Sequence, residues 1–231
     1  MGMDKEPGVA PPESAPSEIV LISDPRIREI EVVDCGEPLV DLRGTLLVDA
    51  RRGDPDGHFA HARESVRDRL VAADRGLPRG IRLLIIEAYR PPRLQLEIFD
   101  AYRSELLRTT PDLSPSEADR LASRYVSPLA VAPHVGGAAV DLTLVDADGN
   151  ELDLGCPEAA TPEESSGACY TAAPGLSLRA REHRAILGEA LTSAGMVNYP
   201  TEWWHWSYGD RYWAFTTNAA HAVYDAASTD G

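Results

Sequence analysis

The chain has 231 residues, and its 22 Lys and Arg against 37 Asp and Glu give a formal net charge of −15 at pH 7. This length supports one large domain with a full hydrophobic core. The acidic balance argues against nucleic-acid and anionic-membrane partners, because phosphate binding requires clustered basic side chains. The sequence shows no apolar run near the ~20 residues of a membrane span and no signal-peptide pattern, so we expect a cytoplasmic protein.

The two ends of the chain differ in composition from its middle. The first segment, residues 1–18, combines four prolines with small and charged residues, a composition that buries too little apolar area to become ordered. Beyond Asn218 the chain becomes small and acidic, and we expect it to fray. We therefore predict a disordered tail over 1–18, a single domain over 19–216 and a C-terminal tail over 217–231.

The predicted domain begins with short apolar runs, which we expect to form peripheral strands and loops. They lie at residues 20–22, 30–33, 38–42 and 46–48. The first helical pattern follows from Phe59 to Ala73, where apolar residues recur every three to four positions.

Two histidines, His58 and His61, lie three apart at the start of that pattern. The spacing could hold a metal, but no carboxylate is arranged to join them. We therefore interpret both as ordinary helix-end histidines.

Residues 81–86 form a nearly continuous apolar run, which is typical of a strand buried on both faces. Arg90 follows, directly before Pro91 and Pro92. The first proline bars a helical conformation at Arg90, and the second can occupy the first turn of a helix. We therefore expect the guanidinium to project from the end of a core strand, at the start of a helix whose apolar stripe covers 94–102.

The middle of the chain adds a helix and a hairpin. A capping-box spacing that starts at Ser114 predicts a helix over 115–125. Residues 134–145 open with a glycine pair and then alternate, so Asp141 and Thr143 should share one face of a strand. A turn and a returning strand over 151–154 follow.

The last third begins with a long irregular loop over 155–175, and loops of this length in a compact domain are often functional. A helix capped by Ser177 follows, and Gly195 ends it. The stretch over 197–215 contains all four tryptophans, and we predict two strands that meet at Gly209-Asp210.

The three cysteines, Cys35, Cys156 and Cys169, are too few for a disulfide framework and show no CxxC spacing. A thiolate zinc site is therefore not supported. Cys156 and Cys169 flank the long loop and could close it if oxidised, but we expect free thiols.

Five polar residues from these segments form a candidate catalytic site. His134, Asp141 and His205 would provide two imidazoles and a carboxylate, a set that suits zinc better than calcium or magnesium and leaves a fourth position for water. Glu202 would act as general base, and Arg90 would face the oxyanion that forms on the attacked carbonyl. Taken alone, the tryptophan-rich stretch is interpreted as a core strand. Its combination with the other motifs of this paragraph favours a catalytic metal site.

The order of these motifs resembles the D-alanyl-D-alanine dipeptidase family of zinc peptidases, typified by the VanX resistance enzymes. The resemblance covers residues 19–216 and implies an α+β fold with a central, mostly antiparallel sheet flanked by helices, shared with D,D-carboxypeptidases and the Hedgehog signalling domain. It also implies Zn²⁺ held by His134, Asp141 and His205, with Glu202 as base and Arg90 as stabiliser of the tetrahedral intermediate. The implied substrate is a small cell-wall dipeptide, D-Ala-D-Ala or a relative, and a homodimer is compatible with the sequence.

Two positions depart from that family. Members usually carry a serine two residues before the first histidine ligand, and here Ala132 occupies that position. The aspartate thought to hold the substrate ammonium corresponds to Ala159, and Glu158 is an adjacent substitute. The chemistry is therefore expected to be retained, with an altered substrate clamp.

These departures keep two alternatives open. One is a zinc D,D-carboxypeptidase or an amidase acting on another small peptide or metabolite. The other is a non-catalytic binding module on the same fold, which is disfavoured because the ligand set and the base are both complete.

Overall fold

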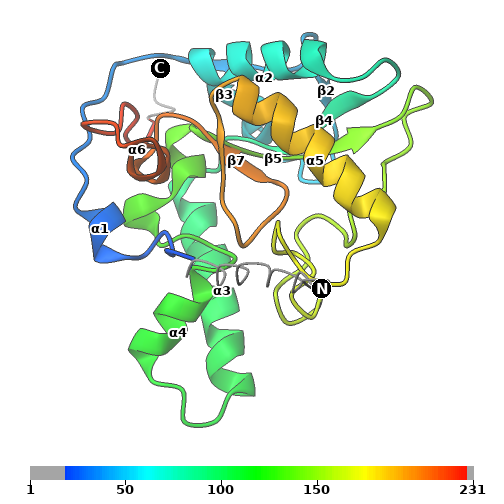
Figure 1. The fold of residues 1–231 in the computed structure, drawn as a ribbon. Coiled ribbons are helices and arrows are strands. Elements are labelled where there is room, and N and C mark those ends of the chain that lie inside the picture. The colour runs from blue at the N-terminus through cyan, green and yellow to red at the C-terminus, as the bar shows by residue number, and fades with distance from the viewer. Residues whose placement is uncertain (1–18, 228–231) are drawn as a thin grey trace, which may run out of the picture.

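A central five-stranded sheet organises the chain (Figure 1). The computed structural model describes residues 19–227, and the tail predicted over 1–18 lies outside that range. The strand order is β2-β4-β5-β7-β6, in which β2 and β4 are parallel and the other neighbours antiparallel. The prediction of an α+β fold with a mostly antiparallel sheet is confirmed. The strands are β2 (Leu47–Val48), β4 (Arg82–Glu87), β5 (Ala139–Val145), β6 (Val197–Asn198) and β7 (His205–Ser207), and a small second sheet pairs β1 (Leu39–Asp41) with β3 (His61–Arg63).

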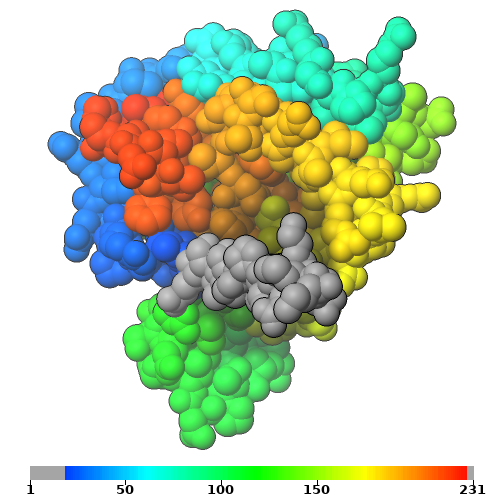
Figure 2. Space-filling model, viewed as in Figure 1, coloured from blue at the N-terminus to red at the C-terminus, as the bar shows by residue number. Residues whose placement is uncertain are grey.

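Helices flank the sheet. α2 and α5 pack against each other, with α2 above the sheet and α5 crossing in front of its strands, and α3 and α4 form a hairpin below it (Figure 1). That hairpin projects as a separate lobe in the space-filling view (Figure 2). The helices are α1 (Pro25–Arg28), α2 (Glu64–Gly76), α3 (Pro92–Thr109), α4 (Pro115–Ala122), α5 (Leu178–Ser193) and α6 (Arg211–Thr217), with 3₁₀ turns η1 (His58–Ala60), η2 (Leu129–Val131) and η3 (Pro133–Gly136).

The main hydrophobic core lies between the sheet and the helices α2 and α5. Alternate residues of β4 and β5 point into it, because successive side chains of a strand face opposite sides. Asp141 and Thr143 of β5 therefore point to the other face, as predicted, and both are buried there. The core residues from these elements are Val66, Leu70, Leu83, Ile85, Val140, Leu142, Leu144, Leu187 and Leu191.

Local sequence signals set several boundaries as predicted. α3 begins at Pro92, immediately after the Arg90-Pro91 junction. Ser114 and Glu117 form the reciprocal capping box of α4. The Ser177 side chain accepts a hydrogen bond from the backbone N–H of Ala180 and so caps α5.

Two predicted elements are wrong because longer-range pairing or capping prevails over local periodicity. The helix expected from Phe59 begins only at Glu64, since residues 61–63 pair with β1 as β3. The second strand expected after Gly209-Asp210 is instead helix α6, because the Asp210 carboxylate accepts hydrogen bonds from the first backbone N–H groups of that helix and caps it.

Three smaller expectations are also corrected. The returning strand over 151–154 reduces to one bridge between Val145 and Glu151. The runs at 20–22 and 30–33 form no regular strand, apart from a bridge between Val32 and Ala222.

The chain beyond Asn218 does not fray where it is described. The backbone N–H of Ala222 donates to the carbonyl of Glu31, and Ala222 and Tyr224 are buried. These contacts extend the packed region to Ala227. Within the described residues, no helix combines the length and apolar character that a membrane crossing requires.

Candidate active site

The register of the sheet places three polar residues in one row. Asp141 of β5 pairs with His205 of β7 on one side and with Glu87 of β4 on the other. A register shift between Ile85 and Glu87 brings Glu87, rather than Ile86, opposite Asp141. Directly opposed residues in antiparallel strands place their side chains on the same face, about 4.5–5.5 Å apart at Cβ.

His134 reaches this row from the turn η3. The turn ends at Gly137, which has a φ of +66°, and a Cβ there would lie 2.3 Å from Leu39 Cδ2. The positive φ favours glycine, and any side chain there would also require Leu39 to move. The glycine pair thus folds the chain back so that His134 Nε2 lies 3.4 Å from Asp141 Oδ2.

The three predicted ligands converge on one point. His134 Nε2 lies 3.1 Å from His205 Nδ1, and His205 Nδ1 lies 3.0 Å from Asp141 Oδ1. All three side chains are buried. Donor atoms around a tetrahedral zinc, with bonds of about 2.0–2.1 Å, are about 3.3 Å apart. The spacing and the chemistry of this donor set therefore fit zinc.

The surroundings prepare these groups as ligands. His134 Nδ1 lies 2.6 Å from the Ala88 carbonyl, so Nδ1–H donates there and Nε2 presents a lone pair to the other two residues. Burial opposes ionisation of Asp141, yet His134 and His205 hold its pKa well below the ordinary value. Burial also lowers the pKa of His205, against the pull of Asp141, which favours the neutral imidazole.

Arg90 lies at the end of β4, as predicted, and two side chains hold it. Its Nε donates to Glu87 Oε1 and its Nη2 to Glu87 Oε2, both at 2.7 Å, and Nη1 donates to Gln95 Oε1 at 2.9 Å. These contacts use three of the five N–H donors of a guanidinium. Nη2 also lies 3.7 Å from Asp141 Oδ2, so the remaining donors lie beside the ligand cluster.

Glu202 lies in the turn that leads into β7. Asn198 braces this turn by donating through Nδ2 to the carbonyls of Glu202 and His205, at 2.9 and 3.0 Å. Thr171 Oγ1 donates to Asn198 Oδ1 and ties the turn to the long loop. Burial, together with the nearby carboxylates of Asp141 and Glu158, raises the pKa of Glu202 well above the ordinary value, and Arg90 opposes this rise.

A cavity of about 30 Å³ adjoins the cluster, with Arg90, Asp141 and Glu202 in its wall, whereas His134 and His205 do not line it. Trp204 forms part of the apolar wall and is buried, which agrees with the expectation that the tryptophan-rich stretch contributes to the core. The cavity is also lined by Arg52, Glu87, Ile98, Tyr125, Val126, Glu158 and Ala159. Charged groups converge here from the sheet and from the loop that follows it.

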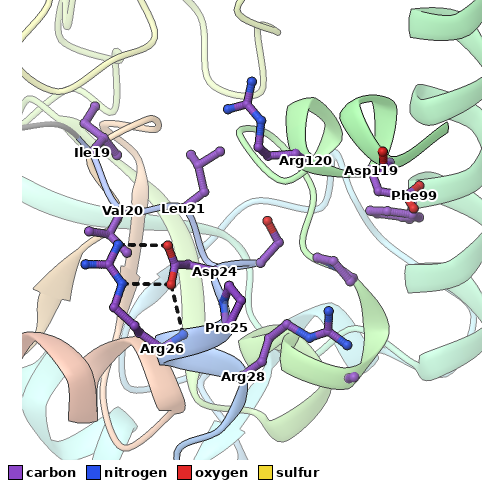
Figure 3. Close-up of a pocket in the computed structure, with 14 residues that line it drawn as sticks. Ile19, Val20, Leu21, Asp24, Pro25, Arg26, Arg28, Phe99, Asp119 and Arg120 are labelled. Atoms are coloured by element: carbon purple, nitrogen blue, oxygen red, sulfur yellow. Dashed lines mark hydrogen bonds and ion pairs between the residues drawn. The ribbon is translucent and has the colours of Figure 1, made fainter. Parts of the chain in front are cut away.

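A much larger cavity, about 720 Å³, lies elsewhere, between the segment around α1 and the α3–α4 hairpin (Figure 3). Asp24 and Arg26 form an ion pair in its wall, at 2.8 Å. None of the five candidate site residues lines it. Chemistry rather than cavity size therefore identifies the site.

A second cluster of metal-type ligands contains Asp54, Asp56 and His58. The Asp54 carboxylate already accepts hydrogen bonds from the backbone N–H groups of Asp56, His58 and Phe59. His61 Nδ1 lies 2.8 Å from the Gly57 carbonyl. Two expectations are therefore corrected: a carboxylate does join His58, since His58 Nδ1 lies 3.1 Å from Asp54 Oδ1, and His61 belongs to β3 rather than to a helix end.

Sequence reasoning missed four residues of this region. Glu87 carried a signal, since a glutamate at the end of a buried strand, three residues before Arg90, requires a partner. Gln95, Asn198 and Arg52 carried none, because their roles depend on long-range contacts. The cysteines, by contrast, are all free as expected.

Known proteins resemble this chain in sequence and in fold. A family model described as D-ala-D-ala dipeptidase matches residues 59–224. A D-alanyl-D-alanine dipeptidase of Synechocystis sp. is 29% identical over 224 residues, covering 83% of this chain and 90% of the relative. One from Escherichia coli is 32% identical over 127 residues, 54% of each chain. Among solved structures, VanYB in complex with D-Alanine-D-Alanine overlays with a TM-score of 0.41 at 17% identity, over 71% of this chain and 81% of that one.

Proposed function

The chain belongs to the D-alanyl-D-alanine dipeptidase family, and we propose that it is a zinc-dependent peptidase that hydrolyses D-Ala-D-Ala or a closely related dipeptide. The observation that carries the proposal is the buried convergence of His134, Asp141 and His205 on one point. Glu202 and Arg90 line the adjoining cavity, so a base and a cation are available beside the donor set.

Zinc bound between the three donors would supply a Lewis acid and lower the pKa of water from about 15.7 towards about 7. Glu202 then takes the proton of the attacking water and returns it to the departing amine. The burial that raises its pKa suits this double role, because the carboxyl must hold a proton between the two steps.

Arg90 stabilises the negative charge that develops on the attacked carbonyl oxygen. Glu87 and Gln95 fix the plane of the guanidinium through three N–H groups, and the other two are left for substrate. Preorganised donors of this kind contribute about 3–4 kcal/mol each to transition-state stabilisation. Glu87 also balances the charge of the buried guanidinium.

Zinc content and turnover test the proposal together. We expect purified protein to hold one zinc per chain and to release D-alanine from D-Ala-D-Ala. Glu202→Gln should keep the zinc and lose activity by about 10²–10⁴-fold, whereas Glu182→Gln, an exposed change on α5, should match wild type. The proposal would be refuted by purified protein that lacks stoichiometric zinc, or by full hydrolytic activity in Glu202→Gln.

A second candidate keeps the metal and changes the substrate to that of a D,D-carboxypeptidase or an amidase. Ala132 and Ala159 motivate it, because neither can hydrogen-bond a substrate through its side chain. A panel of dipeptides of varied stereochemistry beside longer peptides separates the two. Preference for free D-Ala-D-Ala would reject the second candidate.

A further inference from the structure

The active-site cavity is closed to a ligand of the proposed size. Its volume of about 30 Å³ holds one or two water molecules, which is far less space than a dipeptide needs. Glu158 and Ala159, which belong to the long loop after Gly155, form part of its wall. Part of the wall must therefore move before a dipeptide can enter.

One buried arginine holds both ends of the loop segment that carries these two residues. Arg184 of α5 donates from its guanidinium to four backbone carbonyls on either side of the segment. The acceptors are the carbonyls of Leu154, Ala168, Tyr170 and Thr171, at 2.6–3.1 Å. Residues 155–167 thus run between two fixed ends, and we call them the arch.

The backbone of the arch has positive φ angles near both ends. Gly155 has a φ of +97° and Ala159 one of +59° on the first side, and Ser166 and Gly167 have +50° and +81° on the other. Glycine adopts either sign of φ readily, whereas a residue with a Cβ is strained in this region. Rotation of the chain at these positions therefore costs little and relieves the strain at Ala159 and Ser166, as expected of hinges.

The part of the arch between the hinges satisfies many of its own backbone groups. Thr161 Oγ1 accepts a hydrogen bond from the Glu164 N–H at 3.1 Å, and Glu164 Oε2 accepts one from the Thr161 N–H at 3.0 Å. The Gly167 N–H donates to the Pro162 carbonyl at 2.8 Å. Apart from Pro162, none of the arch residues, all of which are described, is fully buried. A segment with its own hydrogen bonds and little buried apolar surface can move as a unit.

The closed position of the arch leaves one buried carboxylate without a hydrogen bond on one oxygen. The Glu158 side chain is 4% exposed, and its Oε1 has no partner among the described residues. Arg52 Nη2 lies 3.5 Å away, which is longer than the 2.7–2.9 Å typical of charge-assisted hydrogen bonds. Movement of the arch away from the cavity returns this carboxylate to water, which favours opening.

Polar contacts with the α3–α4 hairpin and the residues after it oppose that movement. The Glu163 carboxylate accepts hydrogen bonds from Tyr102 Oη of α3 at 2.5 Å and from Arg124 Nη2 at 2.6 Å. Tyr125 Oη donates to the Ala159 carbonyl at 3.1 Å. The Glu163 side chain is 49% exposed, so water can replace its partners when the arch leaves. These contacts are weaker anchors than the buried ones of Arg184.

We infer that the arch is a lid over the active-site cavity and that Glu163 is the latch that controls its opening. The lid turns about its two ends, which Arg184 keeps in place, and carries Glu158 and Ala159 out of the cavity wall. Its return after entry excludes water from the site. The inference rests on the proposed function only for the identity of the ligand that enters, a dipeptide. Glu163 itself acts on the rate of entry and takes no part in the proton transfers.

Amide hydrogen exchange on zinc-loaded protein tests the latch without any ligand. Glu163→Gln removes the charge of the latch, and Tyr102→Phe removes one hydroxyl donor and leaves the ring. Each should speed exchange over residues 155–167 about two- to tenfold, the effect of weakening one exposed charge-assisted contact, while α5 keeps wild-type protection. Glu105→Gln is the matched control, because this exposed glutamate of α3 pairs with Arg108 and lies outside the latch.

Stopped-flow tryptophan fluorescence tests whether the lid controls entry. D-Ala-D-Ala is mixed with zinc-loaded Glu202→Gln protein, which does not turn it over, and Trp204 in the cavity wall reports its arrival. We expect the observed rate to reach a plateau at high dipeptide concentration, because opening precedes binding. Addition of Glu163→Gln or Tyr102→Phe should raise that plateau about two- to tenfold, and Glu105→Gln should leave it unchanged.

Two results would overturn the inference. One is arch exchange that stays at the wild-type rate in both Glu163→Gln and Tyr102→Phe. The other is an observed binding rate without a plateau, or with a plateau that neither change raises. Failure of wild type to bind and hydrolyse D-Ala-D-Ala would instead count against the proposed function, and hydrogen exchange would still decide for or against the lid.

Discussion

Replacement of Glu158 by Gln should stabilise the metal-free protein at high pH. Burial, with Asp141 nearby, raises the pKa of Glu158 from 4.5 to about 7, and Arg52 only partly opposes this. A raised folded-state pKa means that the folded protein binds the proton more tightly than the unfolded chain. The stability from that proton is complete below pH 4.5 and is lost as pH rises through about 7. Between pH 5.5 and 8.5 the loss amounts to about 2 kcal/mol.

Urea unfolding of EDTA-treated protein at pH 5.5, 7 and 8.5 measures this loss. The free energy of unfolding of Glu158→Gln, relative to that of wild type, should be about 2 kcal/mol higher at pH 8.5 than at pH 5.5. Glu182→Gln, which removes an exposed carboxylate, should follow wild type at every pH. Parallel pH profiles for wild type and Glu158→Gln would refute the reasoning, because the carboxyl would then titrate alike in the folded and unfolded states.

Three further results are expected. Glu87→Gln should cost about 3–5 kcal/mol in urea unfolding, because it leaves the buried Arg90 without its ion pair; a loss below about 1 kcal/mol would contradict this. Arg184→Met should speed amide hydrogen exchange over residues 154–171 while α3 keeps wild-type protection, since the change frees four carbonyls of the loop. Zinc added at pH 7 should release protons, because a cation beside Glu202 reverses the rise in its pKa; calorimetric heats that do not vary with the buffer's ionisation enthalpy would count against it.

Much of the site could be predicted because its residues lie on elements with strong local signals. The Arg90-Pro91-Pro92 junction fixes the end of a strand and the start of a helix without help from the rest of the chain. Alternation in β5 predicts the face of Asp141. Spacing alone could not show that Asp141 faces His205, since that depends on the register between β5 and β7.

Two of the failures arise from pairing between strands, and one arises from a helix cap. The periodicity over 59–73 predicts a helix, but residues 61–63 pair with β1, and the cross-strand hydrogen bonds are invisible in a local window. Asp210 looked like a turn residue, whereas its carboxylate caps α6. The register shift in β4 that brings Glu87 opposite Asp141 leaves no signal in an apolar run. Local patterns therefore located the elements better than they defined their pairing.

The balance of charge connects the candidate metal centre with the carboxylates that line the adjoining cavity. Four carboxylates, those of Glu87, Asp141, Glu158 and Glu202, line the cavity with the two guanidinium groups of Arg52 and Arg90. Counted from the carboxylates and guanidinium groups alone, this arrangement carries an excess of two negative charges. Burial is the largest cause of the raised pKa values of Glu158 and Glu202, and the neighbouring carboxylates add to it. A divalent cation held by His134, Asp141 and His205 would offset that excess and lower the pKa of both carboxyl groups.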